Sequence, residues 1–304
     1  MKTQINSILI PTDFSELSES ALKVGLAIAK RQQAEVTLLH VVDTFSYIEP
    51  TEVFLPDFKI TPDVISSIEE KLKDLVESIK QETGINITGK VLDGIPSDRI
   101  CRYALKEHIS LIVMGTHGIS GIRKFFMGSE AFRVLKNASC PVLTIPGNWQ
   151  KTDFEKVLFP VRLKPGALDK YFYARPIIEK NNSEVTILGL ADQKKPDESK
   201  EIALLMDKIK AQLHSDNVRF RSSLCTSDDF PATIINVSIE NEIDLIILTA
   251  NLDYYFKTFF IGPYAQQVVN HSHLPVLAIK PSKKVSKDPS SLELAQKWGK
   301  SILK

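Results

Sequence analysis

The chain has 304 residues, of which 43% are hydrophobic and 25% charged, a composition typical of an ordinary globular protein. Lys and Arg number 38 and Asp and Glu 37, a net charge of +1, which argues against a nucleic-acid-binding protein. No apolar run approaches the ~20 residues that cross a bilayer, and the three cysteines, odd in number and widely spaced, favour neither a disulfide framework nor a zinc site. With no signal-peptide layout at the N-terminus, these features predict a cytoplasmic protein without a transmembrane segment.

Strand-like and helical patterns alternate along the first half of the chain. The expected strands are short apolar runs, as in strands that are buried on both faces. They are Ile5–Pro11, Glu35–Val42, Ile85–Leu92, Leu111–Gly115 and Val142–Ile145. Helical spacing of apolar residues predicts helices from about Ser15, over Pro62–Glu82, over Ser97–Glu107 and over Ala131–Ala138.

The second half repeats the first. Residues 157–162 match residues 8–13, residues 184–188 match residues 35–39, and residues 274–279 match residues 140–145. We therefore expect two domains, 1–147 and 152–281, followed by a basic tail, 282–304. The tail has helical spacing of apolar residues, and it could dock on the protein itself, bind a partner or touch anionic lipid.

Strands that alternate with helices predict a parallel sheet with right-handed crossovers and helices on both faces. In such sheets, ligands bind beyond the carboxyl ends of the strands, where the strand order reverses. Residues that directly follow a strand are therefore the first candidates for a site.

One such candidate is a glycine and serine pattern that follows the run Leu111–Met114. It reads Gly115, two residues, Gly118, nine residues, then Gly128 and Ser129. Glycines allow a sharp turn and a close approach of backbone N–H groups, and the helix that begins here offers a positive dipole end to an anion. The pattern fits a polyphosphate cradle, and it fits tight turns equally well.

Asp13 directly follows the first strand and would share a sheet edge with Gly115 if the first and fourth strands are neighbours. A carboxylate there can accept hydrogen bonds from a base amine or from ribose hydroxyls. It can also cap the helix that begins near Ser15. Both roles stay open at the level of the sequence.

Together these residues resemble the universal stress protein family over about residues 1–281. The pattern matches the family's ATP-binding motif Gly-x2-Gly-x9-Gly-(Ser/Thr), Pro11–Glu16 looks like its first-strand signature, and Ser139–Val142 looks like its last-strand entry. The resemblance implies two five-stranded parallel sheets of order 3-2-1-4-5, of the adenine nucleotide alpha hydrolase-like type, packed as an internal pseudo-dimer. It implies ATP, with or without Mg²⁺, as the ligand, held by Pro11, Thr12, Asp13, Val41, Met114, Gly115, His117, Gly118, Gly128, Ser129 and Glu130.

Two residues of this set are not obvious ligands for a phosphate. His117 is a weaker anion ligand than arginine near neutral pH. Glu130 would repel a phosphate if it pointed inward, so we expect it to face solvent. Arg123 and Lys124 could compensate, or they could simply be the solvated tip of the loop.

The second half departs from the motif. Arg162 stands at the position of Asp13, Thr249 at that of Gly115, Leu252 at that of Gly118 and Pro263 at that of Ser129. Pro263 removes an N–H group from the would-be anion site, and the aromatic run Tyr254–Phe256 adds bulk. We therefore predict no ATP in the second half, which would serve as a structural partner or take a different ligand.

The leading hypothesis is an ATP-binding stress-response protein that acts as a nucleotide-dependent regulator without being an enzyme, through ordering of the loop Thr116–Met127. No catalytic residue and no metal site is predicted. One alternative is a slow ATPase or nucleotidyl transferase at the same site, and a second is an interaction protein that binds no nucleotide. The partner protein and any homo-oligomer beyond the internal pair are not indicated by the sequence.

Overall fold

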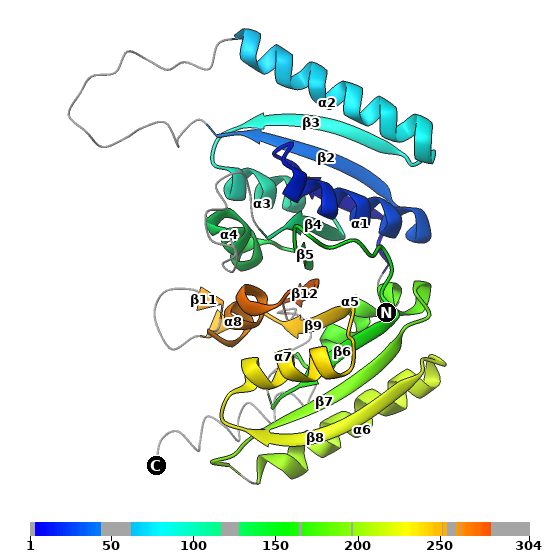
Figure 1. Ribbon diagram of the computed structural model, residues 1–304, viewed down its shortest axis with the longest axis vertical. Helices are drawn as coiled ribbons and strands as arrows, with labels where there is room; N and C mark the ends of the chain where they lie inside the picture. The colour runs from blue at the N-terminus through cyan, green and yellow to red at the C-terminus, as the bar shows by residue number, and fades with distance from the viewer. Residues whose placement is uncertain are drawn as a thin grey trace, which may run out of the picture. The chain divides into compact units, whose positions relative to one another are not determined.

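The protein is described here from a computed structural model, which covers residues 4–43, 62–116, 128–163, 166–195, 197–250, 252–253, 260–261 and 263–280. The chain divides into two compact α/β units (Figure 1). One comprises Gln4–Phe154 with Val269–Leu277, and the other comprises Glu155–Val268 with the residues after Leu277. Residues 4–154 are called the first half below, and residues 155–280 the second half. The predicted tail lies outside the described residues.

The first half is a five-stranded parallel sheet of order β3-β2-β1-β4-β5. This confirms the strand order 3-2-1-4-5. Its elements are β1 (Ser7–Pro11), α1 (Glu16–Gln32), β2 (Glu35–Val42), α2 (Pro62–Thr83), β3 (Ile87–Asp93), α3 (Pro96–Lys106), β4 (Leu111–Gly115), α4 (Ser129–Asn137) and β5 (Val142–Ile145).

Two strands begin later than the sequence predicts. β1 begins at Ser7 instead of Ile5, and β3 begins at Ile87 instead of Ile85. Before β3 the chain leaves α2 through Gly84, whose φ of 69° is left-handed, and the N–H of Ile85 bonds the Thr83 hydroxyl. Both isoleucines fit a strand because they are apolar, and for Ile85 this turn geometry keeps the residue out of the ladder.

α1 lies directly on the sheet. A Cβ at Gly25 would come 2.5 Å from Cδ1 of Ile10 in β1, so only glycine permits this approach. The helix starts at the N-cap Ser15, with Glu16 and Glu19 in its first turn, and it ends at Gln33, whose φ of 56° is left-handed.

The segment that leaves β5 is anchored on α1. The Ser20 hydroxyl donates to the carbonyl of Gly147 at 2.8 Å, and a Cβ at Gly147 would come 2.2 Å from Leu17. Further along, Arg31 donates to the carbonyl of Thr152, and Phe154 is fully buried. Residues 147–154, which span the predicted boundary between the two domains, are therefore packed against the first half.

The second half repeats the same strand order, as β8-β7-β6-β9-β12, with parallel pairing of β6 with β7 and β9 and of β7 with β8. Its elements are β6 (Lys156–Val161), α5 (Asp169–Lys180), β7 (Glu184–Asp192), α6 (Glu198–Ser215), β8 (Phe220–Ser227), α7 (Phe230–Glu240), β9 (Leu245–Thr249), β10 (Leu252–Asp253), β11 (Phe260–Ile261), α8 (Pro263–His271) and β12 (Val276–Ile279).

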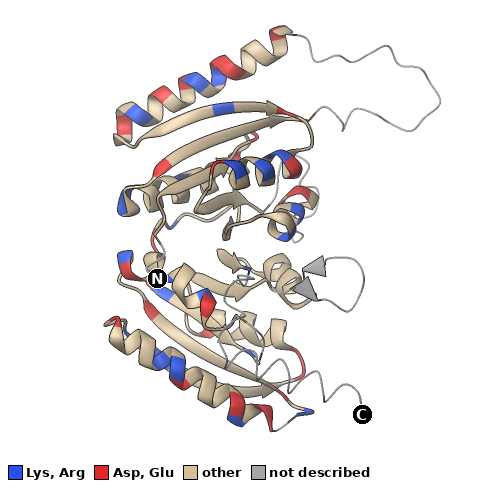
Figure 2. Cartoon of the chain, turned by 180° about the vertical axis from the view of Figure 1, so that it is seen from behind, with Lys and Arg blue, Asp and Glu red and all other residues tan. Residues whose placement is uncertain are grey.

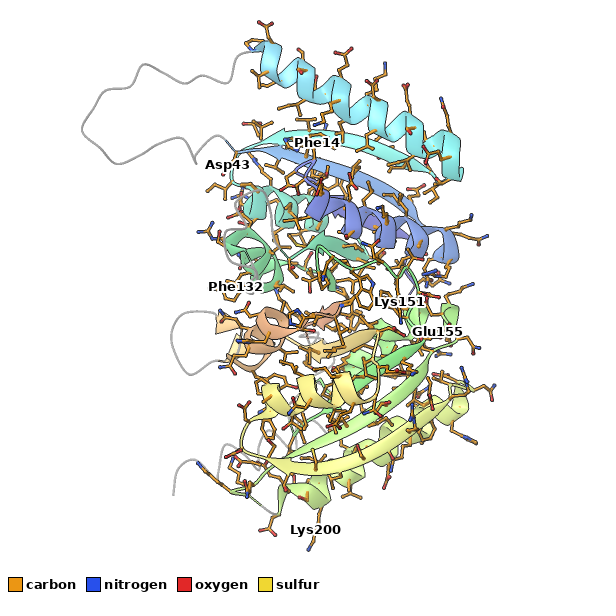
Figure 3. The ribbon with its side chains drawn as sticks, in the orientation of Figure 1. Phe14, Asp43, Phe132, Lys151, Glu155 and Lys200 are labelled. Carbon is orange, nitrogen blue, oxygen red and sulfur yellow. The ribbon has the colours of Figure 1, made fainter. Side chains whose placement is uncertain are left out.

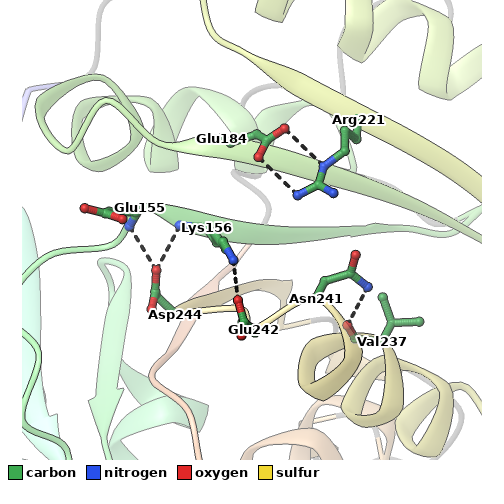
Figure 4. A network of polar contacts seen from close by, with 8 residues as sticks. All are labelled: Glu155, Lys156, Glu184, Arg221, Val237, Asn241, Glu242 and Asp244. Carbon is green, nitrogen blue, oxygen red and sulfur yellow. Dashed lines mark hydrogen bonds and ion pairs between the residues drawn. The ribbon is translucent and has the colours of Figure 1, made fainter.

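Polar contacts fasten the starting ends of the strands in the second half (Figure 4). The buried carboxylate of Asp244 accepts from the backbone N–H of Glu155 at 3.1 Å and of Lys156 at 2.9 Å. Lys156 pairs with Glu242, and Arg221 of β8 pairs with Glu184 of β7. These contacts hold the amino ends of the strands together, at the edge of the sheet opposite to their carboxyl ends.

The outer faces of α2 and α6 carry both signs of charge (Figure 2), as expected of solvated helices. No helix in the described part of the chain is long and apolar enough to cross a membrane. None of the three cysteines, Cys101, Cys140 and Cys225, forms a disulfide within the described residues.

Candidate functional site

The candidate site of the first half lies where two central strands end. β1 and β4 pair directly, with Ile8 beside Leu111 and Leu9 beside Ile112. β1 connects through α1 to β2 on one side of this pair, and β5 lies beside β4 on the other. The strand order therefore reverses between β1 and β4, and the residues that follow them share the sheet edge at which ligands bind in this kind of fold.

Asp13 stands at this edge and also organises the start of α1. Its Oδ1 accepts from the backbone N–H of Ser15 at 3.1 Å and from the Ser15 hydroxyl at 2.5 Å. Ser15 in turn caps the helix by accepting from the N–H of Ser18 at 3.2 Å. The capping role is thus real, though Asp13 acts through Ser15 rather than as the cap itself. A second role toward a ligand is compatible with this position.

Three side chains from different elements form a column beside Asp13. The ring of Phe14 (labelled in Figure 3) lies 4.7 Å from the ring of His40 in β2, centroid to centroid, and the Lys71 ammonium of α2 lies 4.4 Å from the Phe14 centroid. Phe14 adopts a φ of 60°, which is costly for a bulky residue. His40 Nδ1 lies 2.9 Å from the carbonyl of Thr12. The column therefore holds the chain of residues 12–14 in a strained conformation at the site edge.

The phosphate side of the candidate site is built by the junction of β4 and α4. The N–H of Thr116 donates to the carbonyl of Ile145 at 3.1 Å, and the N–H of Gly128 donates to the carbonyl of Thr116 at 2.8 Å. Thr116 and Gly128 therefore lie side by side. α4 begins there with Gly128 as N-cap and without a side-chain cap, so no side chain of the cap residue satisfies the N–H groups of its first turn.

Glu130 is partly open to solvent, with 34% of its side chain exposed, and it makes two contacts that the sequence did not predict. Its Oε2 accepts from the backbone N–H of Ser97 at 2.7 Å, and its Oε1 pairs with Arg133. The α3 helix lacks a side-chain cap of its own, because its N-cap is Ile95. The Glu130 carboxylate therefore caps α3 from the neighbouring helix, which ties the start of α4 to the start of α3.

Replacing this carboxylate should destabilise the fold without lowering any affinity for ATP. We expect Glu130→Ala to lower the free energy of unfolding by about 1 kcal/mol, the usual cost of a lost cap. Urea unfolding measures the loss, and Glu77→Ala in the solvated face of α2 is the matched control, with an effect within about 0.5 kcal/mol. Because the backbone N–H at position 130 is kept, ATP affinity should not fall. A fall would place the carboxylate itself in the ligand contact.

His40 should titrate below its ordinary value. Burial lowers the pKa of His40 from 6.5. The hydrogen bond to the Thr12 carbonyl and the charge of Asp13 raise the pKa by less, and the charge of Lys71 lowers it by the smallest amount. The folded state thus favours the neutral ring, and this stability is lost as the pH falls from 6.5 through the folded-state pKa. NMR titration of the ring should give a midpoint below 6.5 that moves upward in Phe14→Leu. A wild-type midpoint at or above 6.5 would contradict the burial of the ring.

The described residues place nine of the eleven predicted site residues at the carboxyl ends of β1, β2 and β4 or at the start of α4. His117 and Gly118, like Arg123 and Lys124, lie outside the described residues. His40, Lys71 and Ser97 were not predicted. His40 carried a signal, since it is the polar member of the otherwise apolar run Leu38–Val42, but nothing in the sequence pairs it with Lys71. The nine placed residues are Pro11, Thr12, Asp13, Val41, Met114, Gly115, Gly128, Ser129 and Glu130.

The corresponding region of the second half is built differently. After β9, the backbone forms a small antiparallel ribbon in which β10 pairs with β11, Leu252 opposite Ile261 and Asp253 opposite Phe260. Neither strand was predicted. Backbone groups that would line a phosphate loop are used for this ladder instead. Gly262 and the aromatic run Tyr254–Phe256 lie outside the described residues.

No cluster of three or more His, Cys, Asp or Glu side chains that could hold a metal ion occurs in the described ranges. Asp13 is a carboxylate at the site edge, and its Oδ1 is engaged by Ser15. The site, as far as it is described, thus combines backbone N–H groups with the carboxylates of Asp13 and Glu130.

A parallel sheet of order 3-2-1-4-5 that occurs twice in one chain defines a tandem α/β protein. The profile of the universal stress protein family matches residues 4–146 and again residues 155–280. The chain belongs to the universal stress protein family and carries two copies of its domain.

Two curated relatives and one solved structure illustrate the likeness. Universal stress protein MJ0531 of Methanocaldococcus jannaschii is 36% identical over 139 residues, which cover 45% of this chain and 80% of that protein. Universal stress protein MJ0577 of the same organism is 31% identical over 160 residues, which cover 48% of this chain and 97% of that protein. A universal stress protein structure from Archaeoglobus fulgidus matches 93% of this chain and 98% of its own with a TM-score of 0.69 and 20% identity, which shows the fold.

Proposed function

We propose that the first half binds ATP and that the protein acts as a nucleotide-dependent regulator in the response to stress. The observation that carries this proposal is the meeting of Asp13 and the start of α4 at the carboxyl ends of the paired strands β1 and β4. Asp13 can accept hydrogen bonds from the nucleoside, whereas the first turn of α4 offers N–H groups and a positive dipole end to the phosphates.

The second half is proposed to bind no ATP. Arg162 replaces the carboxylate that would recognise the nucleoside, and the β10–β11 ladder uses backbone groups after β9. Pro263, the first residue of α8, has no N–H to offer to a phosphate. We therefore expect one nucleotide per chain.

Regulation requires that ATP bind one state of the protein better than another. The column of Phe14, His40 and Lys71 connects the site edge to α2, so the middle of α2, around Lys71, is where a change on binding is expected to be transmitted. Hydrogen exchange of the full chain with and without ATP would show increased protection in α2 as well as in the first turn of α4. Protection confined to α4 would argue for binding without a wider response.

The test of ATP binding begins with the purified full chain. Bound small molecules are released and identified by mass spectrometry, calorimetry then measures binding of added ATP, and ADP formation is followed over hours. We expect a stoichiometry of one and no steady turnover. Absence of ATP both from the released pool and from calorimetry would overturn the proposal, whereas sustained ADP release that is lost in Gly118→Val would indicate an enzyme.

A further inference from the structure

Arg162 occupies an unusual position in the second half. It directly follows β6, and its guanidinium carbon lies 4.4 Å from the centroid of the Phe230 ring and 4.3 Å from that of the Tyr264 ring. Phe230 is the first residue of α7, and Tyr264 is the second residue of α8. Aromatic rings contact guanidinium groups through their faces, so this arrangement holds the planar side chain and leaves its N–H edge for hydrogen bonds.

A second cation lies close to Arg162. Lys170 of α5 is 2% exposed, and its ammonium donates to the carbonyls of Pro160 in β6 and Ile247 in β9. It also lies 4.1 Å from the centroid of the Phe159 ring. Burial first, and the charge of Arg162 second, lower the pKa of Lys170 to about 7. Two cationic side chains therefore share one region of the second half.

The surroundings do not neutralise this charge. Within the described part of the second half, the contacts of Arg162 and Lys170 are with rings and carbonyls, and neither forms an ion pair with a carboxylate. Asp229, the N-cap of α7, uses its carboxylate to accept from the N–H of Ala232 at 3.0 Å. Like charges that are brought together without a counter-charge are costly, and a bound anion would offset that cost.

The two halves differ in charge at matching positions. The first half has two acidic residues there, Asp13 and Glu130, whereas the second half has the cation Arg162 and the uncharged Tyr264. The contact made by Glu130 with the start of α3 is replaced by a sandwich of Arg162 between the starts of α7 and α8. At the end of the first strand of each half, the first half thus presents a hydrogen-bond acceptor, the Asp13 carboxylate, and the second half presents donors, the N–H groups of Arg162.

We propose that Arg162, held between Phe230 and Tyr264, is the anchor of a binding site for a small molecule that carries an oxyanion group, a phosphate or a carboxylate. The N–H edge of the guanidinium binds two oxygen atoms of the ligand. The start of α8 and the nearby ammonium of Lys170 add positive potential. The second half would then sense an anionic metabolite while the first half binds ATP, and this inference does not depend on ATP binding.

The test titrates the full ¹⁵N-labelled chain with sodium phosphate, and separately with sodium acetate, at constant ionic strength held with chloride. The readout is the amide resonances of Phe230 and Tyr264 in TROSY spectra, which report on the second half alone. We expect saturable shifts with one or both salts, and the stronger of the two identifies the oxyanion. Arg162→Gln should abolish the saturable shifts. Arg162→Lys, which keeps the charge without the planar fork, should weaken the apparent affinity about tenfold.

Arg219→Gln is the matched control, because Arg219 is an exposed arginine of the same half that donates to the carbonyl of Asn182. It should leave the titration unchanged. If Arg162→Gln does not fold, the wild type and Arg162→Lys still decide the question. The proposal is overturned if neither salt produces saturable shifts in the wild type, or if a folded Arg162→Gln variant shifts as the wild type does. Either result would make the sandwich a packing contact only.

Discussion

Asp13→Ala should lower the affinity of the full chain for ATP about a hundredfold, the largest effect that we expect of any single change at the site. Hydrogen bonds to a charged acceptor contribute about 1.5–3 kcal/mol each, and every 1.4 kcal/mol is a factor of ten in affinity. Calorimetric titration with ATP measures the change directly.

The control for this substitution has to separate recognition from folding, because Asp13 also holds the N-cap Ser15. Asp13→Asn keeps an oxygen that can accept from Ser15, so it should preserve the thermal stability of the protein and still weaken ATP binding. Arg162→Ala changes the matching position of the second half and should leave ATP affinity as it is. An Asp13→Ala protein that is folded and binds ATP normally would remove Asp13 from the site.

The second large effect concerns Lys170 and the pH dependence of stability. The folded-state pKa of about 7 lies below the ordinary 10.5, so the unfolded chain binds more protons between these values. The free energy of unfolding should therefore rise with pH across this window, by at most about 1.4 kcal/mol for each pH unit. The contribution is complete above 10.5 and is lost as the pH falls through 7.

Lys170→Met isolates this contribution, because methionine has a similar length and does not titrate. Its absolute stability can change in either direction, since the carbonyls of Pro160 and Ile247 lose a donor while a buried charge disappears. The test is the difference between wild type and variant, from urea unfolding at pH 7, 8 and 9. A difference that does not change with pH would show that Lys170 keeps its proton throughout.

Most of the fold could be predicted from the sequence, because most strands are short apolar runs and three stretches of the first half recur in the second. Strand ends were less predictable. Ile5 and Ile85 look like strand residues, and for Ile85 the backbone turn at Gly84 excludes it from the strand. The ribbon of β10 and β11 was missed because two-residue strands leave no periodic signal.

The place of the candidate site in the fold could be predicted from residues that directly follow a strand. A glycine at the end of a strand and a carboxylate after the first strand both indicate the sheet edge from their positions in the sequence. Contacts between distant residues were not predictable in this way. Glu130 reaches Ser97 and Arg162 lies between Phe230 and Tyr264 because helices from separate parts of the chain begin side by side. Only tertiary structure sets those distances.

Gly147, where the chain leaves β5, leaves no room for a side chain against Leu17 in the first turn of α1. That turn is the one whose N-cap Ser15 is held by Asp13. A methyl group at position 147 would therefore require the Leu17 side chain to move within the same helical turn that positions the site carboxylate. The exit from the first half and the position of Asp13 are thus coupled through Leu17, so a graft of this domain onto another protein should keep Gly147 and Leu17 together.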